Sequence, residues 1–274
     1  MTEISASPKR PVVQNWSDLA SLRQVVDEAS GTLLRSTFAV VGDHDYLWSG
    51  HAETSLPSLT IEEVNRNLEL VRDQEVYPLA TPSTTILRTR EHDVFIKRPK
   101  VHLDDDLPPG FLAQIFYDEA QVLEFLALHP HPNLVQYLGC TIKRSRITGI
   151  ALERYSVTLQ DLSRSGFRDL DWRMLIQHLR RGIDHLHALG LAHNDLNPSN
   201  IALGDQNIPV ILDFGSCKKF GEYLLSAGTP GWAEDIYTSQ KEHDEIALER
   251  IADWLAQGHG EEKKTQQRTS LEKV

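Results

Sequence analysis

Two short stretches decide the fold of this chain, HNDLNPSN at residues 193–200 and DFG at residues 213–215, where Asp213 follows Asn200 by 13 residues. Asn, Asp, Pro, Ser and Gly are common in turns because they make local hydrogen bonds or adopt turn conformations. Either stretch alone would therefore be interpreted as a turn. The two together, at this separation, favour a functional site.

The three polar positions that stand out are Asp195, Asn200 and Asp213. Phosphoryl transfer needs a carboxylate that orients an attacking hydroxyl and accepts its proton, and oxygen ligands that hold Mg²⁺ on the phosphates of the donor. Asp195 suits the first role, and Asn200 and Asp213 suit the second. A short hairpin between the two stretches would bring these side chains together.

These residues resemble the catalytic loop H-R-D-L-x-x-x-N and the metal motif D-F-G of the eukaryotic protein kinase superfamily, above all its short members from filamentous fungi. The resemblance covers about residues 85–256. It is extended by VFIK at 94–97, Glu119 on the following helix, HPNLV at 131–135 and GTPGW at 228–232.

The resemblance implies an α+β, two-lobed protein kinase-like fold. A small antiparallel β-sheet lobe with one helix, residues 84–152, precedes a mainly α-helical lobe, residues 153–256. The helical lobe is predicted to be truncated, because no A-P-E motif and only one helix follow Trp232. Residues 16–83 form an N-terminal extension of unassigned role, and residues 1–15 and 257–274 are predicted to be disordered from their polar composition.

The resemblance also assigns roles to single residues. Lys97 contacts the donor phosphates and pairs with Glu119, with Glu124 as the second choice of partner. Asp195 is the catalytic base, and Asn200 and Asp213 hold Mg²⁺.

The nucleotide's adenine is expected at the hinge between the lobes. Leu152, Glu153 and Tyr155 lie at this position, where backbone groups would bind the adenine and an apolar side chain would pack on it. A simple strand end is the alternative interpretation. Asp244 is expected to start a helix, as its N-cap and as a brace for the catalytic loop.

Three departures from the family pattern bear on activity. No glycine occurs between His51 and Pro109, so the glycine-rich cover of the phosphates is absent before Lys97. Asn194 replaces an arginine that would pair with a phosphorylated activation loop, which favours constitutive assembly. Asn197 replaces a lysine near the transferred phosphate, and a neutral amide stabilises developing charge less well.

The function predicted is that of an ATP- and Mg²⁺-dependent serine/threonine protein kinase, which transfers the γ-phosphate to a protein hydroxyl. One alternative is a pseudokinase that binds a nucleotide or a protein partner. A second is a small-molecule phosphotransferase, since HND followed by Asn also occurs in kinases of choline and aminoglycosides. The DFG glycine and the GTPGW segment favour the protein-kinase branch.

Composition limits the partners and the compartment. Lys and Arg number 28 against 39 Asp and Glu, a net charge of −11, which has the wrong sign for general binding to nucleic acid. Two cysteines cannot build a disulfide framework, and no apolar stretch is long enough for a membrane span or a signal peptide. We expect an intracellular protein, located in the cytoplasm or, as the alternative, in the nucleus, with ATP and a protein substrate or partner as its ligands.

Several elements are predicted from hydrophobic spacing. Helices are expected over 16–29, 60–71, 111–128, 172–189 and 244–255. Strands are expected over 36–41, 85–88, 94–97, 134–138, 147–152, 201–203 and 210–212, with 85–88 and 94–97 paired as a hairpin.

Overall fold

The computed structural model describes residues 8–27, 30–88, 93–99, 107–166, 170–225, 228–233 and 237–271. The chain forms two compact units. Unit 1 contains residues 1–86, 96–117 and 140–150, and unit 2 contains residues 87–95, 118–139 and 151–274.

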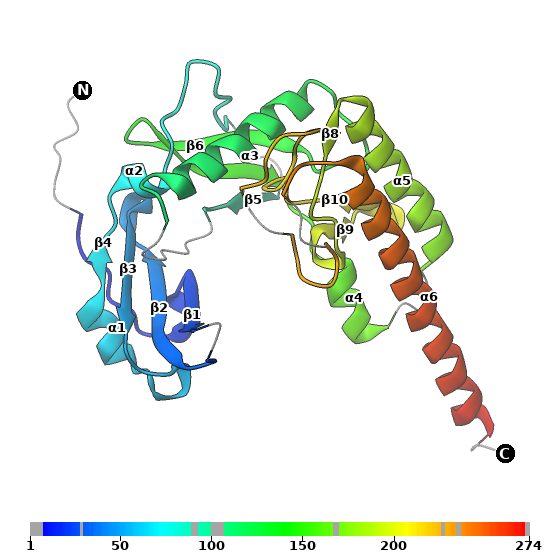
Figure 1. The fold of residues 1–274 in the computed structure, drawn as a ribbon, viewed down its shortest axis with the longest axis horizontal. Helices are drawn as coiled ribbons and strands as arrows, with labels where there is room; N and C mark the ends of the chain where they lie inside the picture. The colour runs from blue at the N-terminus through cyan, green and yellow to red at the C-terminus, as the bar shows by residue number, and fades with distance from the viewer. Residues whose placement is uncertain are drawn as a thin grey trace. The chain divides into compact units, whose positions relative to one another are not determined.

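Unit 1 is built around a four-stranded antiparallel sheet (Figure 1). Its strands run in the order β1 (Ser21–Val26), β2 (Leu33–Val41), β3 (Leu47–Ala52) and β4 (Glu69–Leu70). Helix α1 (Ile61–Asn67) covers one face, and α2 (Asp73–Val76) follows the sheet. Helix α1 begins at a capping box, in which Thr60 and Glu63 satisfy each other's backbone N–H groups.

Two apolar clusters hold this sheet. Phe38, Val40 and Trp48 pack with Val64 and Leu68 on the α1 side, and the opposite face is covered at one end by Val76 and Tyr77. Alternate residues of a strand point to opposite faces, so residues of β2 and β3 serve both clusters. Burial raises the pKa of Tyr77 to about 12.

Gly50 shows how tightly the α1 side is packed. It lies opposite Phe38 in the register of β3 and β2. A Cβ at this position would lie 2.2 Å from the Asn67 carbonyl oxygen and 2.7 Å from Phe38 Cε2. Only glycine lets these backbones approach so closely.

A second, three-stranded sheet has its strands in the order β5 (Val94–Lys97), β7 (Arg146–Glu153) and β6 (Tyr137–Lys143). Helix α3 (Phe111–Ala127) comes before β6 in the chain. The strand predicted over 94–97 and the helix predicted over 111–128 are confirmed. The strand over 147–152 is confirmed with one residue added at each end.

Unit 2 is mainly helical, with α4 (Leu159–Ser165), α5 (Trp172–Ala188) and α6 (Lys241–Leu271). Helices α5 and α6 lie side by side (Figure 1). Asp171 caps α5 by accepting the Met174 N–H at 3.1 Å, and Gly190 follows its end with φ +76°. The buried stripe of α5 is Leu175, Leu179, Ile183 and Leu186, at helical spacing.

Short strands complete unit 2. Strands β9 (Ile201–Leu203) and β10 (Pro209–Ile211) form the predicted hairpin, and β8 (Leu191–Ala192) pairs with β11 (Lys218–Lys219). A 3-10 helix, Pro198–Asn200, precedes β9 directly. The α+β, two-lobed protein kinase-like fold is thereby confirmed, with an antiparallel sheet part and a mainly helical part.

Four secondary-structure predictions were wrong. The helix predicted over 16–29 is a 3-10 helix (Trp16–Asp18) followed by β1, because β1 pairs along β2 and this pairing overrides a weak helical pattern. The helix predicted over 60–71 ends at Asn67, and the chain continues into β4.

The predicted hairpin of 85–88 with 94–97 does not form. Residues 85–88 are not a strand: Ile86 makes an isolated parallel bridge to Cys140, whose N–H donates to Thr85 O at 2.7 Å. Residues 89–92 lie outside the described residues. The strand predicted over 134–138 begins only at Tyr137, since Val135 N–H donates to Ile211 O at 3.0 Å instead.

The predicted disorder at both ends also differs from the structure where it is described. Val13 is buried in the α1 cluster, and Asn65 bonds both its N–H and its carbonyl at 2.8 Å. The last helix starts at Lys241 and runs to Leu271, past the predicted end at 255. None of the described helices is both long and apolar enough to cross a membrane.

Candidate active site

The catalytic-loop stretch lies between β8 and β9 and is braced by Asp244 of α6. The Asp244 side chain is fully buried. Its two oxygens accept the His193 N–H and the Asn194 N–H, each at 2.8 Å, and Oδ2 also bonds His187 Nε2 at 2.9 Å. The predicted brace is confirmed, whereas the N-cap role is wrong, because α6 begins three residues earlier at Lys241.

His193 and Phe214 connect the two motifs. The His193 ring bonds the Leu212 carbonyl oxygen through Nε2 at 2.8 Å and stacks edge-on against Phe214, with centroids 5.2 Å apart. Both residues are almost completely buried. The chain on either side of Asp213 is thus fixed to the chain before Asp195.

The Asp195 carboxylate is held by residues from both sides. Its Oδ1 accepts the Thr229 N–H at 2.8 Å and the Thr229 hydroxyl at 2.7 Å, and Asn197 Nδ2 lies 3.3 Å away. Asn200 Nδ2 donates to Asp195 O at 2.8 Å and to Oδ2 at 3.1 Å. Asp195 and Asn200 are therefore brought together, as the spacing predicts.

Asn197 occupies the place where the family carries a lysine, and it is buried. Its amide also reaches Thr229 Oγ1 at 3.2 Å, and its Oδ1 accepts the Ser199 N–H at 2.9 Å. The amide thus serves the loop itself and supplies hydrogen bonds, but no positive charge, beside Asp195.

Asn194 fixes three segments at once. The residue is buried, with φ +62°, a conformation that asparagine tolerates better than most residues. Its Nδ2 lies 2.9 Å from Ala192 O and 3.0 Å from both Ser216 O and Ser239 Oγ, while Oδ1 lies 3.1 Å from His243 Nδ1. The chain after DFG is therefore anchored to the catalytic loop by a neutral side chain.

Asp213 has φ +57°, and its Oδ1 accepts the Gly215 N–H at 3.2 Å. Glu119 of α3 is buried near this turn: a Cβ on Gly215 would lie 3.2 Å from Asp213 Oδ1 and 3.7 Å from Glu119 Oε2. Glycine at 215 leaves room for two carboxylates.

Lys97 is the last residue of β5 and is half-buried. It belongs to unit 1, whereas Asp195, Asn200, Asp213 and Glu119 belong to unit 2. Glu124 bonds the Tyr137 hydroxyl at 2.8 Å, which gives this second-choice residue a structural role within unit 2.

Of the hinge residues, Leu152 is buried at the end of β7. Glu153 and Tyr155 line a cavity of about 390 Å³ together with residues of the 130–137 segment. The Tyr155 hydroxyl donates to Glu153 Oε2 at 2.9 Å, and burial followed by this bond raises the Tyr155 pKa. Glu153 N–H donates to Gln136 O at 3.0 Å, so this backbone donor is already used within unit 2.

Sequence reasoning missed Thr229, Ser239 and His243 as parts of the site. Thr229 lies within the GTPGW stretch, which supplied a signal, but nothing in the sequence indicates which of its atoms meets Asp195. Ser239 and His243 belong to no motif. They are part of the site because both bond the buried Asn194 side chain.

The family-model comparison matches residues 84–245 to the protein kinase domain. The chain therefore belongs to the protein kinase family, whose members generally use ATP and Mg²⁺. The extension before residue 84 lies outside the match.

Curated relatives are kinases. The human "Serine/threonine-protein kinase/endoribonuclease IRE2" is 35% identical over 116 residues, 37% of this chain and 12% of that protein. The "Sensor for unfolded proteins in the ER ire1" of Schizosaccharomyces pombe is 28% identical over 205 residues, 66% of this chain and 18% of that protein. The "Serine/threonine-protein kinase shk2" of the same yeast is 28% identical over 119 residues, 41% of this chain and 20% of that protein. The chain thus spans a fifth or less of the length of these relatives.

Proposed function

We propose that this chain is an ATP- and Mg²⁺-dependent serine/threonine protein kinase that transfers the γ-phosphate to a protein hydroxyl. The observation that carries the proposal is the set of hydrogen bonds around Asp195. Thr229 occupies Oδ1, but Oδ2 receives a single N–H from Asn200 within the described residues. A carboxylate oxygen has two lone pairs, so Oδ2 can still accept the proton of a hydroxyl.

We assign the other residues of the site the roles that the resemblance to protein kinases implies. Asn200 and Asp213 would hold Mg²⁺, and Lys97, paired with Glu119, would contact the phosphates. Leu152, Glu153 and Tyr155 would border the adenine. The Glu153 backbone carbonyl is the better candidate for a hinge contact, because its N–H is already bonded to Gln136.

A pseudokinase is the second candidate, and the segment before Lys97 favours it. Within the described residues from 84 to 99, β5 is the only strand, and the sequence there has no glycine. The described residues of this segment therefore form no hairpin that could cover nucleotide phosphates. In that case the chain would keep the fold and act by binding a nucleotide or a partner.

Calorimetric titration of ATP, with and without Mg²⁺, followed by an assay of phosphate transfer separates the two candidates. We expect Mg²⁺-dependent binding that Asp213→Asn abolishes. Transfer of labelled γ-phosphate to casein should then fall by at least about 100-fold in Asp195→Asn, the range in which general base catalysis contributes.

The outcomes that contradict the proposal are distinct. No binding at millimolar ATP would leave only the pseudokinase. Binding without any protein acceptor, combined with ATP consumption in a pool of hydroxyl metabolites, would indicate a small-molecule phosphotransferase instead.

We further propose an intracellular, cytoplasmic protein with ATP and a protein substrate as its ligands, and with neither nucleic acid nor a membrane as a partner. The two cysteines, Cys140 and Cys217, are both free and buried, which supports a reducing compartment. The charge of −11 argues against phosphate-backbone partners.

A further inference from the structure

One face of the unit 1 sheet is only partly covered. Phe38 and Trp48 point into the α1 cluster, so Thr37 and Ser49 point to the other face. At one end of this face Val76 and Tyr77 cover Ala39 and Leu47. The other end opens into a cavity of about 600 Å³, the size range of small-molecule sites.

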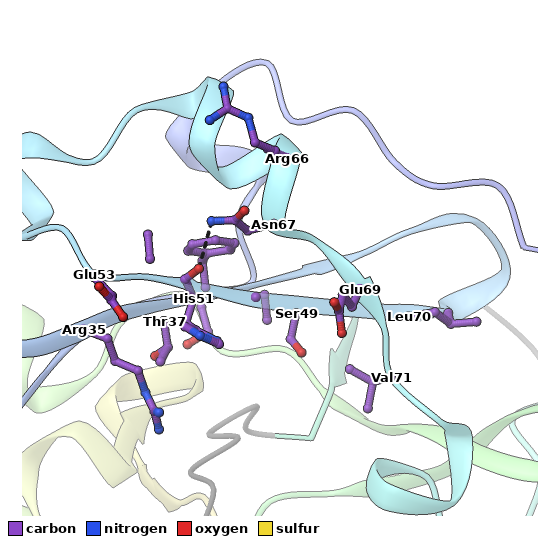
Figure 2. Close-up of a pocket in the computed structure, with 15 residues that line it drawn as sticks. Arg35, Thr37, Ser49, His51, Glu53, Arg66, Asn67, Glu69, Leu70 and Val71 are labelled. Atoms are coloured by element: carbon purple, nitrogen blue, oxygen red, sulfur yellow. Dashed lines mark hydrogen bonds between the residues drawn. The ribbon is translucent and has the colours of Figure 1, made fainter.

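The open end is polar, and its residues lie in register across the strands. Thr37 of β2 lies opposite His51 of β3, and Ser49 lies opposite Ala39. Arg35, two residues before Thr37, also lines the cavity. Figure 2 shows the Arg35, Thr37, Ser49 and His51 side chains on one side of the sheet, with Arg66 directed away from them.

The charge of this face differs from that of the whole chain. The three strands β1, β2 and β3 contain Arg23, Arg35 and His51 but no Asp or Glu, although acidic residues outnumber basic ones in the sequence. The carboxylates that line the cavity, Glu53 and Glu69, lie outside these three strands. The side chains of the three strands therefore favour an anion, and the two carboxylates favour groups that donate hydrogen bonds.

Some polar side chains of the cavity also have hydrogen-bonding groups that are unused among the described residues. In the part of the chain that the structure describes, the side chains of Thr37, Ser49 and His51 form no hydrogen bond or ion pair. A ligand phosphate could accept from a threonine hydroxyl, from an imidazole N–H and from a guanidinium. Thr37 and His51 would not have to give up a side-chain bond within the described protein, whereas the Arg35 side chain already has a partner there.

From these observations we infer that the cavity binds a phosphorylated sugar or polyol. Its phosphate lies against Arg35, Thr37 and His51. Its hydroxyls donate to Glu69, and the neighbouring Leu70 and Val71 contact the carbon chain. The site is built from residues 21–71 alone and uses none of the residues of the proposed kinase site.

The test is calorimetric titration of ribose 5-phosphate into the full chain, with ribose and inorganic phosphate as the comparison ligands. We expect ribose 5-phosphate to bind at least tenfold more tightly than ribose, and more tightly than inorganic phosphate. The double variant Thr37→Val/His51→Gln should weaken binding at least tenfold, because charge-assisted hydrogen bonds are lost.

Two controls make the result specific. Lys9→Gln removes a positive charge from an exposed position of the same unit that does not line the cavity, and should leave binding unchanged. Asp213→Asn should also leave it unchanged, which separates this site from the nucleotide site. Equal binding of ribose and ribose 5-phosphate, unchanged binding in the double variant, or an equal loss in Lys9→Gln would each overturn the inference. So would the absence of binding at millimolar ribose 5-phosphate.

Discussion

The N-terminal sheet and the catalytic-loop region differ in how they use polar side chains. Around Asp195 the polar groups are buried and bonded to segments far away in the sequence, as with Asn194, Asp244 and Ser239. In the sheet the buried side chains are mostly apolar, and polar residues such as Thr37 and Ser49 line an open face. One region is thus held by particular polar residues, and the other by an apolar pattern and close packing.

This difference teaches how sensitive each region is to substitution. A buried polar group leaves its partners unsatisfied when it is removed, so the identity of the residue matters. An apolar core tolerates changes that keep volume and pattern but not overfilling. The two regions should therefore fail in different ways.

Asp244→Ala should have the largest effect. It leaves the buried N–H groups of His193 and Asn194 without their acceptor, and we expect the free energy of unfolding to fall by about 3 kcal/mol or more. Urea unfolding measures the loss, and amide exchange should place it in the catalytic loop. Asp253→Ala, at an exposed position of the same helix, is the matched control and should change stability by less than about 0.5 kcal/mol. A loss of similar size in both variants would contradict the role of Asp244 as a brace.

The catalytic-loop region is sensitive to substitution because particular polar residues hold it. It could be predicted from the sequence for the same reason, since such residues form recognisable motifs. Asp195, Asn200 and Asp213 stand at the spacing of the family's two motifs, so short motifs reveal them. Even so, the motif gave no indication that Asn194 would anchor the chain at Ser216, because that depends on where a segment 22 residues later folds back.

The sheet was harder to predict, because its signal is weaker and non-local. Residues 21–26 are a strand only because β2 is available to pair with them, and pairing between strands distant in sequence is not written in either strand alone. Most of the β2 strand was predicted, since residues 36–41 are rich in apolar and β-branched residues. The open face carries no motif, and only the register brings Thr37 and His51 together.

Gly50→Ala should have an intermediate effect and act on the sheet. The added methyl group overlaps the Asn67 carbonyl oxygen and the Phe38 ring, and overpacking of this kind costs about 1–3 kcal/mol. We expect faster amide exchange in β2 and β3, with the catalytic loop unaffected. Ser49→Ala, on the neighbouring residue, removes atoms without any overlap and is the control. An equal increase of exchange in the catalytic loop would show that the two regions unfold as one.

The smallest effect should be the pH dependence that His131 contributes in unit 2. Burial, followed by the nearby His185 and Arg181, lowers the His131 pKa below 6.5, and its Nδ1 accepts the Asn133 N–H at 3.2 Å, which requires the neutral ring. Below about pH 6.5 the unfolded chain therefore binds a proton that the folded chain does not, so stability present at neutral pH is lost as the pH falls towards the folded pKa. Urea unfolding at about pH 7.5 and about pH 5.5 should show a smaller loss for His131→Gln than for the unchanged chain. An equal loss in both would mean that the buried polar groups of unit 2 keep their bonds independently of this histidine.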